Sequence, residues 1–372
     1  MEKESLSKGI SVIIPCYYNW AFVEECLESV FQQKNVNTQV ICVHNNSDAG
    51  LLSKLTKLES EHLITLIDNG RANMGAAFAR NCGLVRVTTD TVMFLDDDDR
   101  IGWNPNHPDL DPYYLEYFYD ALAANSDLAM VAGDVIAETA GIEGTNFKMY
   151  SELPRKAPIT IEQAISYLDG RNTSCATLYR ASVINEYNLR FKAQMKYRED
   201  TEFITQYALA AACKYKQILT PTKWPESSGG LQSYYWYRKH VGSVMGQVSQ
   251  PSLNKWYYEY QRQKDNLGYR AYLLRSIENH PLRPKLSKAH QTMIYGWKHT
   301  QKDIQKDIFY MDTDSFLTMS YYMLTCFDAN GEDAIEEAAK KYLNYYAPTN
   351  NTLKPNDAIA KAAAAKMLST IL

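Results

Sequence analysis

The sequence predicts an α/β fold, in which a mostly parallel sheet is covered by helices and a helical region follows. Over the first hundred residues, short apolar runs alternate with amphipathic helical segments across short connections, which is typical of parallel strands joined by helices. The apolar runs are continuous, as expected of strands buried on both faces. The most unusual polar residues follow directly after these runs, where such sheets bind ligands.

Hydrophobic periodicity predicts the helices and strands that precede the acidic run at residues 96–99. Phe22, Cys26 and Val30 recur at helical spacing, which predicts a helix with one apolar face. The helices expected in this part lie at residues 21–33, 51–62 and 73–87. The strands expected in this part lie at residues 9–18, 38–44, 63–68 and 91–95.

The middle of the chain continues with mixed elements. Thr160 and Gln163 have the spacing of a capping box, which predicts the start of a helix. The other expected elements are a helix at 112–126, one further strand at 128–138, a helix at 161–168, a strand at 173–180, a helix from about 201 and an alternating aromatic stretch at 233–243.

Strand signals fade near residue 250, and the rest of the chain has the pattern of helices rich in Tyr, Lys and Ala. We therefore expect a first domain at 1–250 and a helical C-terminal domain at 251–372. The tyrosines of the second domain fit the ordinary core of a helix bundle, acceptor binding by sugar stacking, or contacts within a homo-oligomer formed through these helices.

Composition and charge narrow the class of protein. The net charge is −4 over 372 residues, which gives no overall attraction to nucleic acid or anionic lipid. There is no transmembrane segment, since no run approaches about 18 apolar residues, and the start of the chain has no apolar signal region. The seven cysteines form no CxxC pair and predict no zinc site. We expect a cytoplasmic protein, either free or at the inner face of the membrane.

Four consecutive carboxylates, Asp96 to Asp99, follow the expected strand at 91–95. Carboxylates at a strand end suit Mg²⁺ or Mn²⁺, which binds one or two of them and shares its other positions between water and substrate phosphate. On an extended chain, Asp96 and Asp98 lie on the same face. Two alternatives are a solvated acidic loop in which Asp99 caps a turn, and a phosphatase-type Asp nucleophile, which is expected at the first strand instead.

Six segments in order resemble the family 2 glycosyltransferases, which are nucleotide-sugar enzymes of the GT-A fold. The resemblance covers roughly residues 9–245. The segments that carry it are SVIIPCYYNWAFVEECLESVFQQ, VICVHNNSDAG, NMGAAFARNCGL, FLDDDD, YRED and YYWYRKHVGS. The resemblance implies a GT-A domain with a donor site at the strand ends.

The resemblance implies roles for residues of the donor site. Asp98 and His240 are the implied ligands of a Mn²⁺ or Mg²⁺ cofactor. The residues implied to bind the donor nucleotide are Pro15, Tyr17, Asn45, Asn73, Arg80, Asp96, Asp97 and Arg238. The alternative interpretation of Arg80 is a surface charge on an amphipathic helix. The alternative interpretation of His240 is a structural role.

The second strand ends differently from the usual family pattern. The family has Asp-Asp-Gly-Ser, whose second Asp accepts a hydrogen bond from uracil, whereas this chain has HNNS at residues 44–47. Asn45 takes the place of the second Asp. Its amide can accept through the carbonyl or donate through the NH₂ group. Uracil is the base that the resemblance implies.

Glu199 and Asp200 match the Glu-Asp pair of the family, with Asp200 implied as the general base and an inverting transfer as the reaction. A carboxylate beside the acceptor hydroxyl deprotonates the nucleophile. Capping of the following helix by Asp200 is an alternative that is compatible with this role.

The resemblance thus implies a metal-dependent inverting glycosyltransferase that moves a hexosyl or N-acetylhexosaminyl group from a UDP-sugar to a hydroxyl of a glycan-type acceptor. A surface polysaccharide or a lipid-linked glycan is the expected acceptor. The alternatives are a non-catalytic glycan-binding or scaffold protein on the same fold, a transferase acting on protein or DNA, and a sugar nucleotidyltransferase. The last normally has a glycine-rich loop after the first strand, and PCYYNWAF has no glycine.

Overall fold

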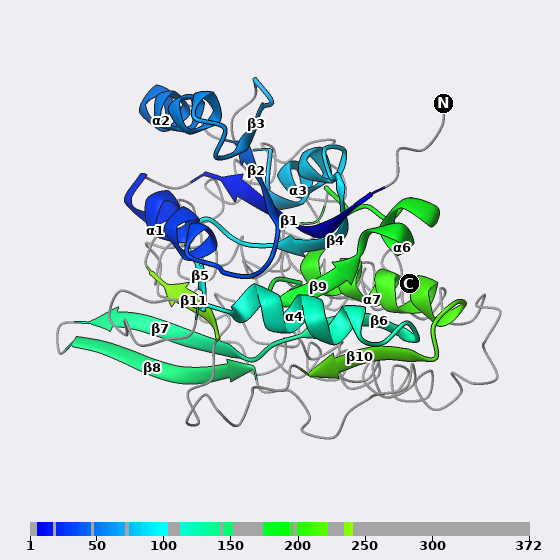
Figure 1. Ribbon diagram of the computed structural model, residues 1–372. Coiled ribbons are helices and arrows are strands. Elements are labelled where there is room, and N and C mark those ends of the chain that lie inside the picture. Colours follow the sequence, from blue (N-terminus) through cyan, green and yellow to red (C-terminus); the bar gives the residue numbers. More distant parts are fainter. Residues whose placement is uncertain are drawn as a thin grey trace, which may run out of the picture. The chain divides into compact units, whose positions relative to one another are not determined.

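The computed structural model describes residues 6–17, 20–45, 48–70, 74–102, 112–141, 144–151, 174–193, 195, 199–221 and 234–240 (Figure 1). The expected helix at 161–168 and the expected C-terminal domain at 251–372 lie outside these residues, so both stay predictions. Within the described ranges, no helix is both long and apolar enough to span a membrane.

The main sheet of the described part has seven strands in the order β10-β6-β9-β4-β1-β2-β3 (Figure 1). Neighbouring strands run parallel, except that β9 is antiparallel to both β4 and β6. Their bounds are β1 (Ser7–Cys16), β2 (Thr38–His44), β3 (Thr65–Asp68), β4 (Thr89–Phe94), β6 (Leu128–Ala132), β9 (Thr177–Arg180) and β10 (Gln217–Pro221). The predicted α/β architecture with a mostly parallel sheet is confirmed.

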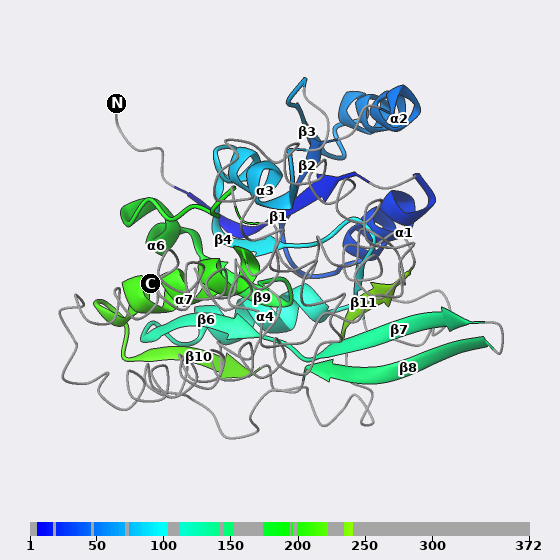
Figure 2. The ribbon, with the colours of Figure 1, turned by 180° about the vertical axis from the view of Figure 1, so that it is seen from behind.

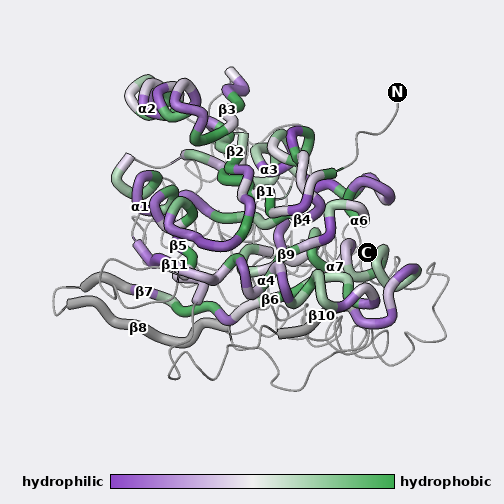
Figure 3. Tube along the Cα trace, in the orientation of Figure 1, coloured by the Kyte–Doolittle hydropathy of each residue, from purple (hydrophilic) through white to green (hydrophobic). Residues whose placement is uncertain are grey.

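Helices cover both faces of this sheet. Figures 1 and 2 show α1 and α4 on one face and α3, α6 and α7 on the other. The helices are α1 (Trp20–Phe31), α2 (Ala49–Ser60), α3 (Ala76–Leu84), α4 (Tyr114–Ala123), α6 (Ala181–Glu186) and α7 (Glu199–Ala212). Figure 3 shows the hydrophobic residues along β1 and β2 that this two-sided cover buries. A parallel sheet needs such cover, which explains the continuous apolar runs.

An aromatic cluster fixes the start of α7 beside the end of β4. The rings of Phe191 and Phe203 stack with centroids 4.0 Å apart. Phe94, the last residue of β4, lies edge-on to both rings at 4.8 and 5.3 Å. Edge-to-face contacts of this kind add about 0.5–1.5 kcal/mol to the burial of the rings. The cluster therefore places Glu199, at the first turn of α7, close to the acidic run that follows β4.

The expected single strand at 128–138 is wrong, because the structure divides this stretch between two sheets. β6 ends at Ala132, and β7 (Val135–Gly141) belongs to a second, four-stranded sheet of the described residues, in the order β5-β11-β7-β8. Gly133 lies between the two strands, and a methyl group there would lie 2.6 Å from the ring of Phe118, so the packing at this point has room only for glycine. The apolar run continues on both sides of the break, so hydrophobic periodicity gives no sign of it.

The second sheet brings a late segment of the chain back to the acidic run. Its other strands are β5 (Arg100–Ile101), β8 (Gly144–Ser151) and β11 (Tyr235–Lys239). β11 pairs parallel with β7 and antiparallel with β5, so that Trp236 lies opposite Arg100. The acidic run ends where β5 begins, and β11 therefore carries its side chains to the same place.

Packing of α3 against β1 generates a stability prediction. A methyl group at Gly83 would lie 2.4 Å from Cγ2 of the buried Ile13. Gly83→Ala is expected to lower the free energy of unfolding by about 1–3 kcal/mol, because the close-packed core has to shift. Urea unfolding followed by tryptophan fluorescence measures this.

Gly50→Ala is the matched control, since it also places alanine in a helix. The atom nearest to its added methyl is the carboxylate of the exposed Asp48 side chain, at 3.1 Å. We expect a change within about 0.5 kcal/mol. Equal free energies of unfolding for the Gly83 variant and the wild type would contradict the packing argument.

Candidate active site

The predicted site residues meet at the carboxyl ends of the central strands. In this sheet the chain proceeds from β1 to β2 and β3 in one direction and to β4 in the other, so ligands are expected beyond the ends of β1 and β4. Two hydrogen bonds connect the residues there. The backbone N–H of Asn45 donates to the Cys16 carbonyl at 2.9 Å, and that of Tyr17 donates to Asp97 Oδ2 at 2.6 Å.

The acidic run is folded as a turn and is not extended. The Asp99 N–H donates to the Asp96 carbonyl at 3.0 Å. The expectation that Asp96 and Asp98 share one face of an extended chain is therefore wrong. The turn directs the four carboxylates to separate partners, since stacking them on one face would concentrate their mutual repulsion.

Asp99 is the structural member of the run. It is 2% exposed, and it accepts hydrogen bonds from the Tyr235 hydroxyl at 2.6 Å and from the Arg238 N–H at 2.8 Å. Burial, together with the neighbouring Asp98, raises its pKa well above the usual range. Both donors belong to β11, so Asp99 fastens this strand to the acidic turn.

Asp98 faces His240, the residue that follows β11. Asp98 Oδ2 and His240 Nε2 lie 2.9 Å apart, and burial raises the pKa of Asp98. A carboxylate and an imidazole fit Mn²⁺ or Mg²⁺ as a partial ligand set, which substrate phosphate and water complete. The described ranges contain no cluster of three or more His, Cys, Asp or Glu side chains that would form a full protein cage. The two residues therefore fit a cation that arrives with a phosphorylated ligand.

Arg80 connects the acidic turn to α7. Its guanidinium donates to Asp96 Oδ1 at 2.6 Å and to Glu199 Oε1 at 3.1 Å, and it lies over the ring of Phe191 at 5.2 Å. Arg80 is 3% exposed, so the interpretation as a solvated surface charge is wrong. The guanidinium lies between the predicted donor site and the predicted base.

Asn81 holds the loop that leads to this base. Its side-chain amide donates to the Phe191 carbonyl and accepts from the Phe191 N–H, both at 2.8 Å. An amide that pairs with one backbone position in both directions fixes that position as a strand ladder does. α3 therefore positions the ring of Phe191 as well as Arg80.

Glu199 and Asp200 lie in the first turn of α7. Asp200 Oδ1 accepts the Thr201 N–H at 2.7 Å. Asp200 is already the second residue of the helix, so it does not occupy the N-cap position that the alternative interpretation expected. Burial, followed by repulsion from Glu199, raises the pKa of Asp200 to about 8. Burial also raises the pKa of Glu199, against the attraction of Arg80. A carboxyl group with a pKa near neutrality is suited to general acid–base chemistry.

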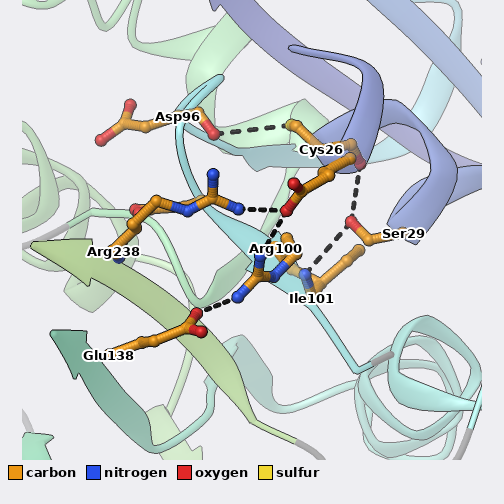
Figure 4. A network of polar contacts seen from close by, with 9 residues as sticks. Cys26, Ser29, Asp96, Arg100, Ile101, Glu138 and Arg238 are labelled. Atoms are coloured by element: carbon orange, nitrogen blue, oxygen red, sulfur yellow. Dashed lines mark hydrogen bonds and ion pairs between the residues drawn. The ribbon is translucent and has the colours of Figure 1, made fainter. Parts of the chain in front are cut away.

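A second charge network lies beside the acidic turn (Figure 4). Glu25 Oε2 of α1 accepts from Arg100 at 2.5 Å and also from Arg238, and Arg100 donates in addition to Glu138 of β7. The sequence predictions contain neither Glu25, Arg100 nor Glu138. The local sequence gives one sign of this network, which is the charged residue Arg100 between the acidic run and the apolar Ile101.

An aromatic ring connects this network to the Asp98–His240 pair. The Arg238 guanidinium lies over the ring of Phe22 at 4.5 Å, and the His240 ring lies 5.0 Å from the same ring. Phe22 and Glu25 are three residues apart on α1, so one helix face supports both basic side chains. Arg238, predicted to bind the donor, is held here by Glu25.

The other predicted donor-site residues take different positions. Tyr17 is 40% exposed at the end of β1, as an aromatic platform requires. Pro15 lies within β1, paired in register with Val43. Asn45 is buried, and its Oδ1 accepts the Met74 N–H at 3.0 Å. Asn73 lies outside the described residues.

These features define the class of the protein. A mostly parallel sheet with flanking helices and strand-end carboxylates is the arrangement of GT-A proteins, and the solved structures with similar folds agree. The crystal structure of S. aureus TarS 1–349 in complex with UDP-GlcNAc superimposes with a TM-score of 0.58 at 15% identity, covering 98% of this chain and 90% of that one. At that identity the likeness shows the fold.

The family follows from the sequence comparison. Residues 11–188 match the family model "Glycosyl transferase family 2", and this part of the chain belongs to that family. The putative glycosyltransferase EpsH of Bacillus subtilis is 23% identical over 244 residues, 64% of this chain and 62% of that protein. The poly(ribitol-phosphate) beta-glucosyltransferase of Bacillus spizizenii is 23% identical over 250 residues, 66% of this chain and 34% of that protein. The chain thus spans less than two thirds of either relative.

The network around Glu25 generates a second prediction. Glu25→Gln keeps the shape of the side chain but removes the charge that Arg100 and Arg238 share. We expect the free energy of unfolding to fall by about 1–3 kcal/mol, because the buried Arg100 retains only one charged partner. Urea unfolding at low and high salt measures the effect.

Glu24→Gln provides the control, because it makes the same change on the exposed neighbouring position of α1. It is expected to change stability by less than about 0.5 kcal/mol. If both variants unfold at the same urea concentration as the wild type, the network contributes nothing to the fold.

Proposed function

We propose that the protein is a metal-dependent inverting glycosyltransferase, which moves a sugar from a UDP-sugar to a hydroxyl of a glycan acceptor. The observation that carries the proposal is the placement of a carboxylate–imidazole pair and a carboxylate pair at one sheet edge. The Asp98–His240 pair suits a cation with a diphosphate, and the Glu199–Asp200 pair suits proton removal from an acceptor. Arg80 joins the two sides through Asp96 and Glu199.

Teichoic-acid-type polysaccharide is the acceptor class that we propose. Two matching relatives are named poly(ribitol-phosphate) transferases, one for glucose and one for N-acetylglucosamine, and another is named a teichoic acid poly(glycerol phosphate) polymerase. TarS, whose fold is similar, has been solved with UDP-GlcNAc. These names support a UDP-sugar donor and a polyol-phosphate acceptor for this chain.

On the donor side, the residues of the sheet edge bind and orient the nucleotide sugar. Asp98 and His240 would hold Mn²⁺ or Mg²⁺, and the bound cation would offset the negative charge of the diphosphate. Tyr17 offers its ring to the base, and Asp97 fixes the backbone of Tyr17. Arg238 belongs to β11, the strand that donates to Asp99. Once its guanidinium leaves Glu25, it suits the diphosphate.

On the acceptor side, Asp200 removes the proton of the attacking hydroxyl. The acceptor oxygen forms its bond to the anomeric carbon while the bond from that carbon to the diphosphate oxygen breaks, so the configuration inverts. UDP leaves with the electron pair, and the proton stays on Asp200 until solvent takes it. Arg80 holds Glu199 beside Asp200. Burial, followed by the negative charge of Glu199, keeps the pKa of Asp200 high enough for proton uptake, against the opposing effect of Arg80.

The donor site is tested by binding of UDP with Mn²⁺ and again with a chelator, measured by isothermal titration calorimetry. We expect binding that requires Mn²⁺ and is lost in Asp98→Ala, because the cation loses its carboxylate ligand. Asp120→Ala, an exposed position on α4, is the control and is expected to bind as the wild type does. Failure of the folded wild type to bind UDP, GDP or CMP would instead support the non-catalytic scaffold alternative.

The base assignment is tested with Asp200→Asn. Transfer is expected to slow about 10²–10⁴-fold while UDP binding stays unchanged, because the group that removes the proton is lost. In the wild type the base must be unprotonated, and its pKa of about 8 lies above the usual range. Transfer should therefore rise with pH and level off above about pH 8.

A sugar-transfer assay from pH 6 to 9.5 measures the profile. Asp127→Asn, at an exposed position, controls for the loss of one carboxylate. Near-normal transfer by Asp200→Asn, or a rate that falls as the pH rises from 6 to 8, would show that another group is the base.

A further inference from the structure

Arg238 is the arginine of the site whose side chain is free to change partners. Its side chain is 13% exposed, whereas those of Arg80 and Arg100 are 4% and 3% exposed. Arg80 and Arg100 each contact two carboxylates. In the described part of the chain, the guanidinium of Arg238 contacts one carboxylate, that of Glu25. The backbone of Arg238 is held separately by Asp99, so the guanidinium can move while β11 stays in place.

Glu25 holds two guanidinium groups on the same carboxylate oxygen. Its Oε2 accepts from Arg100 at 2.5 Å and also from Arg238 (Figure 4). Two cations on one oxygen repel each other. In agreement with this, burial, followed by the charge of Arg238, lowers the pKa of Arg100. When Arg238 leaves, Glu25 keeps its hydrogen bond to Arg100, so its carboxylate is not left without a cation.

Phe22 brings the Arg238 guanidinium close to the proposed cation site. The guanidinium lies over the Phe22 ring at 4.5 Å, and the His240 ring lies 5.0 Å from the same ring. His240 in turn contacts Asp98 at 2.9 Å. Arginine binds phosphate through two parallel N–H groups, whereas Glu25 engages a single nitrogen of Arg238. A diphosphate beside this cation site would therefore compete with Glu25 for Arg238.

We propose that Glu25 is a positioning residue that holds Arg238 until the diphosphate of the donor displaces it. The proposal rests on the proposed function, which supplies the diphosphate. Binding of UDP exchanges one partner of Arg238 for another, and release of UDP returns Arg238 to Glu25. Glu25 thereby weakens the binding of UDP. A residue with only a structural role has the opposite effect, because its loss disturbs the site and weakens binding.

The experiment compares the binding of UDP with Mn²⁺ to the wild type and to Glu25→Gln by isothermal titration calorimetry. We expect the dissociation constant of the variant to be about fivefold lower, because UDP no longer has to break one partly exposed ion pair. Glu24→Gln is the matched control. It removes the same charge at the exposed neighbouring position of α1 and should bind UDP as the wild type does.

A double-mutant cycle shows whether the effect passes through Arg238. In an Arg238→Gln background, Glu25→Gln should leave the dissociation constant unchanged, since there is no guanidinium to release. Equal or weaker binding of UDP by Glu25→Gln, in protein that thermal unfolding shows to be folded, overturns the proposal, and so does the same gain in both backgrounds. If the wild type does not bind UDP in the presence of Mn²⁺, the proposed function itself fails, and the proposal about Glu25 fails with it.

Discussion

The structure of the site depends on the need to neutralise four adjacent carboxylates, of which Asp97, Asp98 and Asp99 are buried. A carboxylate out of water is costly unless a cation or hydrogen-bond donors surround it. The turn at Asp96–Asp99 meets this constraint by sending each side chain to a different element: α3, the end of β1, the residue after β11, and β11 itself. Segments more than a hundred residues apart in the chain are thereby held at one edge of the sheet.

Much of this could be predicted from the sequence, because its causes are local. Continuous apolar runs mark strands covered on both faces, and the alternation with helices gives a parallel sheet whose ligand edge follows from its topology. The positions of Tyr17, Asn45 and the acidic run at strand ends needed no long-range information. The resemblance to a family then predicted that four more residues lie at that edge, and the structure places all four there: Glu199, Asp200, Arg238 and His240.

What could not be predicted is set by contacts between distant segments. The break between β6 and β7 lies at Gly133, which packs against the ring of Phe118, and periodicity along one strand contains no trace of it. The turn of the acidic run needs Tyr235 and the backbone of Arg238, which come from β11. Glu25 has the ordinary spacing of a polar residue on an amphipathic helix, and its role follows only from the two arginines that reach it. Which residues pair with one another, unlike which segments form helices or strands, is decided only by the folded chain.

Arginine is well suited to the two buried positions that join these segments, for a geometric reason. Arg80 and Arg100 each contact two carboxylates from different elements, which a planar guanidinium does with separate nitrogens. A lysine offers one compact charge on a flexible stem and would hold one partner firmly at most. Because each guanidinium bridges two elements, the carboxylates on both sides are positioned before any ligand binds. A preorganised site of this kind avoids the cost of ordering its charges at the moment of reaction. Buried ion pairs are therefore consistent with a site that acts at the surface of the fold.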